Sequence, residues 1–77
     1  MTINGIDVPD EVINGCEQYM RERPVFLEEE LAEYLHTTHY IRYSYSFTRS
    51  LIRKYFNDGK IEHNGKRREW RWKATSQ

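Results

Sequence analysis

The chain has 77 residues, too few for more than one domain, and its content of 38% hydrophobic and 31% charged residues is typical of a soluble globular protein. A single cysteine excludes an internal disulfide, and the sequence has neither a secretory signal nor an apolar run of the roughly 18 residues that span a bilayer, so we expect a cytoplasmic protein. The net charge is zero, but residues 1–35 have nine acidic and two basic side chains whereas residues 36–77 have three acidic and ten basic ones, which indicates a polyanion-binding surface in the C-terminal half.

The first predicted helix covers about residues 8–22, after a flexible lead-in over residues 1–6. Pro9 suits a first helical turn, where the helix dipole also favours the two acidic residues that follow it. Gly15 costs about 1 kcal/mol inside a helix unless a neighbouring element packs closely against it. The helical apolar stripe, in which we expect the cysteine to be buried, consists of Val12, Ile13, Cys16, Tyr19 and Met20.

A short extended segment at Val25 and Phe26 separates this helix from a second one over about residues 27–36. Leu31 and Leu35 belong to the buried stripe of the second helix, and its outer face is acidic. Residues 37–43 do not continue the helical pattern and are predicted to be a connection. Three alternating tyrosines in this connection and just after it either pack in part against the core or stack on unpaired bases, namely Tyr40, Tyr43 and Tyr45.

The third helix is the most strongly specified element. Ser44 or Ser46 is expected to cap it, and Asn57, Asp58 and Gly59 supply a left-handed stop. Its expected buried face consists of Phe47, Leu51, Ile52, Tyr55 and Phe56. The opposite face, which has a single sign of charge, collects Ser46, Arg49, Ser50, Arg53, Lys54 and Asn57.

A β-hairpin is predicted over residues 60–73, with a two-residue turn at Asn64 and Gly65. This register sets Glu62 opposite Arg67 and Lys60 opposite Glu69. The other face, expected to cover the core, carries Ile61, Trp70 and Trp72. Residues 74–77 have no pattern and are expected to fray.

The predicted order of helix, extended segment, helix, connection, helix and hairpin resembles the winged helix-turn-helix family over about residues 8–72. The resemblance rests on LEEELAEYL at residues 27–35, which has a small residue inside the second helix, and on RSLIRKYFNDGKI at residues 49–61, which is similar to a recognition helix, its glycine stop and the first wing strand. It implies a mostly α, α+β fold of three helices with a C-terminal wing. It also implies a small DNA-binding protein, either a transcriptional regulator or an accessory factor.

The resemblance implies that the third helix enters the major groove of double-stranded DNA and that the wing lies over the backbone. Arg49 or Arg53 then pairs with guanine, and the wing cations contact phosphates. The expected DNA-binding residues are Arg42, Ser46, Arg49, Ser50, Arg53, Asn57, Lys66, Arg67 and Arg68. One recognition helix covers few base pairs, so a homodimer or a protein partner is expected as well. The small size suits an accessory protein of a phage or mobile element.

Acidic residues at the start of the second helix favour an alternative to DNA binding. In many helix-turn-helix complexes this end lies near the DNA backbone, where Glu28 to Glu30 would repel phosphate. The predicted connection between the second and third helices is also longer than the usual turn. The alternative is a protein–protein interaction module without DNA binding, which docks through Glu29, Glu30 and Glu33 or associates with itself.

Little in the sequence supports catalysis or metal binding. His36 and His39 are three residues apart, but no further ligand follows at zinc spacing. The chain has no glycine-rich phosphate loop, no nucleophile motif and no paired carboxylates in an apolar setting. We therefore expect a protein that is not an enzyme and that uses no metal or other cofactor.

Overall fold

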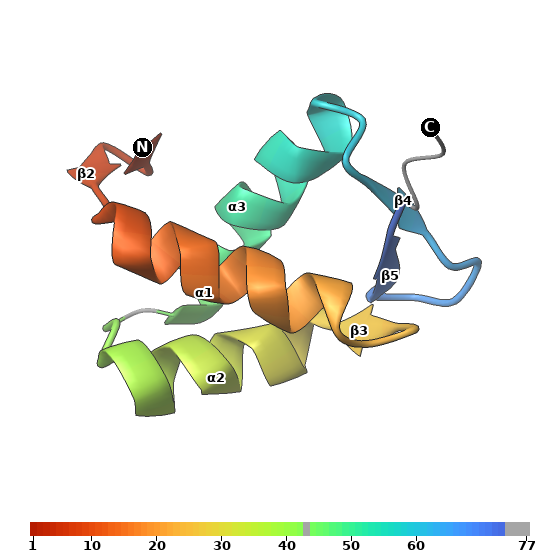
Figure 1. Cartoon of the computed structure of the whole chain (residues 1–77), viewed down its shortest axis with the longest axis horizontal. Helices are drawn as coiled ribbons and strands as arrows, with labels where there is room; N and C mark the ends of the chain where they lie inside the picture. Colours follow the sequence, from red (N-terminus) through yellow and green to blue (C-terminus); the bar gives the residue numbers. More distant parts are fainter. Residues whose placement is uncertain (43, 74–77) are drawn as a thin grey trace.

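The computed structural model describes residues 1–42 and 44–73. These residues form a small α+β domain with three helices and two small antiparallel sheets (Figure 1). Tyr43 and the predicted frayed tail at residues 74–77 lie outside the described residues. No helix within the described part of the chain is long and apolar enough to cross a membrane.

The chain begins with a β-hairpin formed by β1 (Thr2–Ile3) and β2 (Ile6–Asp7), so the predicted lead-in over residues 1–6 is corrected. Asn4 and Gly5 at its tip have φ angles of 53° and 74°, as a two-residue turn with two left-handed positions requires. Ile3 is only 3% exposed and belongs to the core. The buried Ile3 side chain therefore anchors this hairpin to the core. The Asn4-Gly5 pair is a typical two-residue turn sequence, so the hairpin could have been predicted from it.

Helix α1 (Asp10–Arg21) follows, with Pro9 immediately before it and a buried face that includes Cys16 at 0% exposure, as predicted. Gly15 lies where α1 meets α2. A Cβ atom at this position would be 2.6 Å from the Tyr34 hydroxyl oxygen and 3.0 Å from Nε2 of His39. The close approach of α2 therefore explains why glycine is tolerated inside this helix.

Strand β3 (Phe26–Leu27) confirms the extended segment, and α2 (Glu28–His39) continues three residues beyond the predicted end. The hydroxyl of Thr37 donates to the carbonyl of Glu33 at 2.9 Å, which satisfies this β-branched polar residue within the helix. Tyr40 ends the helix in the left-handed conformation, with φ of 55°. Because α3 begins at Ser44, the connection is shorter than the predicted one over residues 37–43.

Helix α3 (Ser44–Asn57) buries Phe47, Leu51, Ile52 and Tyr55, as predicted, and ends before Gly59, whose φ is 77°. Two details differ from the prediction. Ser44 is the first residue of α3 and Ser46 lies in its first turn, so neither precedes the helix as a cap, and Phe56 is 49% exposed. The Phe56 ring packs edge to face against the Trp70 ring, with centroids 5.4 Å apart.

Strands β4 (Ile61–His63) and β5 (Glu69–Trp72) form the predicted C-terminal hairpin, and β3 joins it to give the strand order β3-β5-β4. The register differs from the prediction, since Ile61 pairs with Trp72 and Glu62 with Arg71 across a five-residue loop. The two-residue turn would set Ile61 opposite Arg68, whereas the observed register pairs apolar side chains on the buried face.

The core fills the space between the three helices and the sheet β3-β5-β4, which closes one end of the helical layer (Figure 1). Tyr55 of α3 and Phe26 of β3 are among its largest fully buried side chains. Trp70 and Trp72 pack against it from β5, as predicted, and the Trp72 ring centroid lies 5.9 Å from that of Tyr55. The sheet is thereby fixed to the end of α3.

Candidate functional site

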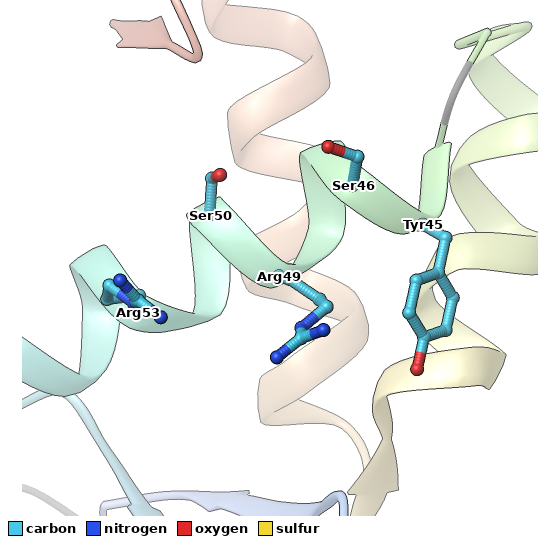
Figure 2. A pocket seen from close by; sticks show the side chains of 5 residues that line it. All are labelled: Tyr45, Ser46, Arg49, Ser50 and Arg53. Atoms are coloured by element: carbon cyan, nitrogen blue, oxygen red, sulfur yellow. The ribbon is translucent and has the colours of Figure 1, made fainter.

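The exposed face of α3 carries two arginines one helical turn apart, Arg49 and Arg53. Together with Tyr45, Ser46 and Ser50 they line a shallow groove along the helix (Figure 2). Figure 2 shows that Tyr45 and Arg49 extend from one side of α3 and that Ser46 and Ser50 lie along the opposite edge. The groove therefore has a cationic side and a hydroxyl side.

A second groove runs between α3 and the sheet and shares the same two arginines. Its other lining residues come from α2, α3 and β5, namely Glu28, Ile52, Phe56 and Trp70. The indole N–H of Trp70 donates to Oε2 of Glu28 at 2.8 Å. A carboxylate is thus held in place beside Arg49 and Arg53.

Several predicted cations have no anionic partner in the part of the chain that the structure describes. Within the described residues, ion pairs engage Lys54 with Asp58, Arg68 with Glu29, and Arg71 with Glu62. No ion pair within the same residues involves Arg42, Arg49, Arg53, Lys66 or Arg67. Since an unneutralised guanidinium attracts anions more strongly than a paired one, Arg49 and Arg53 form the cationic centre of this face.

The loop between β4 and β5, which we call the wing loop, presents the exposed side chains of Lys66 and Arg67. Arg68 behaves differently from these two. Its guanidinium lies 3.6 Å from Oε1 of Glu29, and its carbonyl accepts a hydrogen bond of 3.1 Å from the backbone N–H of Glu28. Arg68 therefore ties the base of the wing loop to the start of α2.

The N-terminal hairpin lies against the hydroxyl side of α3. Ser50 donates its hydroxyl to the side-chain oxygen of Asn4, and the Asn4 amide group donates to the carbonyl of Ser46 at 3.5 Å. Ser50 is thus engaged within the protein, while the Ser46 side chain is exposed. Asn4 was not among the predicted site residues, because no local pattern indicates which helix a hairpin tip will meet.

The remaining predicted contacts lie at the margins of this face. Arg42 is exposed in the connection before α3, and Asn57 is exposed at the last position of α3. Of the alternating tyrosines, Tyr40 is 83% exposed and Tyr45 is partly buried. The structure therefore gathers Ser46, Arg49, Ser50 and Arg53 in one groove and does not bring Arg42 or Asn57 into it.

The acidic residues form a separate surface between α1 and α2. Glu29, Glu30 and Glu33 line a groove there with Tyr19, Arg23, Tyr34 and Thr37. The Arg23 guanidinium stacks over the Tyr19 ring, 3.5 Å from its centroid, and burial raises the pKa of both tyrosines above the ordinary value. This groove therefore combines two phenol groups with one guanidinium and three carboxylates of α2.

Glu28 and Trp70 were missed as site residues by the sequence analysis. The acidic run at residues 28–30 does not show which of its members turns toward α3, and Trp70 was predicted only to cover the core. One feature of the sequence could have indicated a polar partner for Trp70, because a partly buried indole N–H usually donates to an acceptor. No group of three or more potential metal ligands occurs among the described residues.

Comparisons of the chain with protein families, with curated proteins and with solved structures found no match.

Proposed function

We propose that this protein is a small DNA-binding domain of the winged helix-turn-helix type, a transcriptional regulator or accessory factor. In this proposal α3 enters the major groove of double-stranded DNA and the wing loop lies on the phosphate backbone. The observation that carries it is the pair Arg49 and Arg53, which is exposed on one face of α3 without an ion-pair partner in the described residues.

The topology supports the winged helix assignment. After the N-terminal hairpin, the chain order of helix, strand, helix, helix and two strands is the order on which the resemblance rests. The four-residue interval between α2 and α3 also removes the objection that the connection is too long for the family. Arg68 holds the base of the wing loop to α2 through Glu29, and its guanidinium lies 5.8 Å from the centroid of the Tyr45 ring of α3.

The dimensions and chemistry of α3 support major-groove binding. A helix of 14 residues is about 21 Å long, and the major groove, about 12 Å wide, admits an α-helix. Arg49 and Arg53 are suited to bidentate hydrogen bonds with guanine, and Lys66 and Arg67 to phosphate contacts. Ser50, whose hydroxyl is engaged by Asn4, acts in this proposal by holding the hairpin against α3.

A duplex titration tests the proposal. Anisotropy of a labelled 20-base-pair duplex of random sequence should report binding at 50 mM salt that weakens steeply by 200 mM. With phosphate contacts by Arg49, Arg53, Lys66 and Arg67, the slope of log K against log salt should be roughly −3 to −4. Absence of duplex binding at low salt would exclude the proposal.

Two matched variants locate the surface. Arg49→Ala and Arg53→Ala should each lower affinity by about tenfold and reduce the magnitude of the salt slope by roughly one. Arg21→Ala removes the same charge from α1, where Arg21 pairs with Glu17 at 3.2 Å, and should leave the slope unchanged. Equal effects of all three substitutions would mean that only net charge matters.

The groove between α1 and α2 favours a second candidate function, a protein–protein interaction module. Its carboxylates and half-buried tyrosines suit a basic partner, including the wing loop of another copy of the chain. Glu30→Lys with Glu33→Lys should then abolish association, measured by light scattering at two salt concentrations, and leave duplex affinity unchanged or raised. Unchanged scattering would show that this surface is only solvated.

A further inference from the structure

We propose that Glu28 is a specificity-determining residue that accepts a hydrogen bond from the exocyclic amine of cytosine, beside a guanine bound by Arg49 or Arg53. This inference rests on the proposed function and assigns a base preference to the same site. It starts from an unusual placement, a carboxylate in the groove between α3 and the sheet that the two free arginines also line.

One hydrogen bond holds this carboxylate, and further contacts position the two residues that form it. Trp70 donates its indole N–H to Oε2 of Glu28, at 2.8 Å. The indole ring is in turn held between Phe56 and His63, with centroid distances of 5.4 Å and 5.0 Å. The backbone N–H of Glu28 donates to the carbonyl of Arg68 at 3.1 Å, which fixes the first residue of α2 to the wing loop.

The second carboxylate oxygen remains available. Among the described residues Glu28 forms no ion pair, although Arg49 and Arg53 line the same groove, and no hydrogen bond is found at Oε1. A fixed anion at the surface that approaches DNA is repelled by phosphate, so it is compatible with binding only where it meets a hydrogen-bond donor.

The donors that the major groove offers are the amines of cytosine and adenine. Adenine presents its N7 acceptor next to its amine, which a carboxylate opposes, whereas cytosine presents a donor without an acceptor of its own beside it. The guanine of a G·C pair offers the two acceptors that an arginine binds. A groove that combines a carboxylate with two arginines therefore matches cytosine and guanine together.

Selection from a library of random 20-base-pair duplexes, followed by sequencing of the bound fraction, tests the inference. The wild-type protein should enrich sites in which a required cytosine lies in the base pair next to that of a required guanine. In Glu28→Gln, the amide oxygen stays on Trp70 and the NH₂ group faces the DNA, so the preference for cytosine over thymine at that position should fall by about fivefold or more. Glu33→Gln, on the outer face of α2, is the matched control and should leave the selected motif unchanged.

Trp70→Phe gives a second, independent variant, because it keeps an aromatic ring against Phe56 and removes the N–H that holds the carboxylate. It should weaken the cytosine preference at the same position while retaining binding to the library. Circular dichroism of each variant confirms that the fold is kept.

The outcomes separate the two proposals. If Glu28→Gln strengthens binding to all duplexes equally and the motif is unchanged, Glu28 only repels phosphate and this inference is wrong, while DNA binding stands. If the wild-type protein enriches no duplex at low salt, the proposed function fails and the base preference fails with it.

Discussion

Gly15 shows how a single residue reports the packing of its neighbours. Replacing a helix-interior glycine with alanine usually stabilises a protein by about 0.4–1 kcal/mol, because the unfolded chain loses conformational freedom. Here a methyl group would lie 2.6 Å from the Tyr34 hydroxyl, which hydrogen-bonds with His39 at 3.1 Å and whose ring stacks on Tyr19. The Tyr34 side chain would therefore have to move to accept the methyl group, although both its hydroxyl and its ring are held by contacts.

We expect Gly15→Ala to lower the free energy of unfolding by about 1 kcal/mol. The same substitution in a Tyr34→Phe background, where the clashing oxygen is absent, should instead be neutral or stabilising, a coupling of about 1–2 kcal/mol. Urea unfolding of the four proteins in this cycle measures it. Additive effects would show that the hydroxyl does not restrict the site.

At the scale of elements, the N-terminal hairpin is held to the domain by few contacts. Ile3 is 3% exposed, while Ile6 on the partner strand is 59% exposed. The Asn4 side chain adds hydrogen bonds to Ser46 and Ser50 of α3. Most of the docking free energy should thus come from one side chain, since burial of apolar area outweighs exposed hydrogen bonds.

Two isoleucine substitutions test this assignment. Ile3→Ala should lower the free energy of unfolding by about 2–4 kcal/mol, as expected for truncation of a buried side chain. Ile6→Ala, the matched control in the same hairpin, should change it by less than about 0.5 kcal/mol. Denaturant unfolding checks both values, and similar small effects would mean that the hairpin contributes little to the fold.

At the scale of the whole molecule, the charge separation along the sequence does not become a separation in space. The acidic start of α2 lies against the basic wing loop through the Arg68–Glu29 pair and the backbone hydrogen bond between Glu28 and Arg68. Among the described residues, cations without an ion pair include Arg49 and Arg53 on α3 and Lys66 and Arg67 in the wing loop, whereas Glu29, Glu30 and Glu33 line the groove between α1 and α2. These basic and acidic side chains therefore lie on different surfaces of the folded protein, although both halves of the chain contribute to each region where they meet.

Global stability should also respond to alkaline pH, because the core contains protonated groups. Burial raises the pKa of the Cys16 thiol from 9.0 to about 12, and burial with a hydrogen bond to Glu17 raises that of Tyr55. A raised pKa in the folded state means that the unfolded chain loses its proton first. The stabilising contribution is complete below pH 9 and is lost as the pH rises toward 12.

The expected loss for Cys16 is about 1.4 kcal/mol between pH 7 and pH 10. Urea unfolding under reducing conditions at pH 7, 9 and 10 measures the decline, and Cys16→Ala should remove the part of it that comes from the thiol. A wild-type protein whose stability is flat from pH 7 to pH 10 would contradict the burial of the thiol.

Much of the fold followed from local patterns. The three helices, the β3 segment, the left-handed stop at Gly59 and the burial of Cys16 were predicted because periodicity and capping act over a few residues. The predicted register of the C-terminal hairpin was wrong because the favoured turn competed with the pairing of Ile61 and Trp72 on the core. A local turn preference is overridden when a different strand register buries apolar side chains in the core.

At the candidate site, helical spacing alone puts Arg49 and Arg53 on the polar face of α3, so their placement could be predicted from the sequence. The packing of the elements determines that Asn4 engages Ser50, that Arg68 pairs with Glu29, and that Trp70 holds Glu28 between α3 and the sheet. These contacts join residues about 40 apart in the chain. The physical reason is that helical periodicity is local, whereas the partner of a polar side chain is set by how the elements pack.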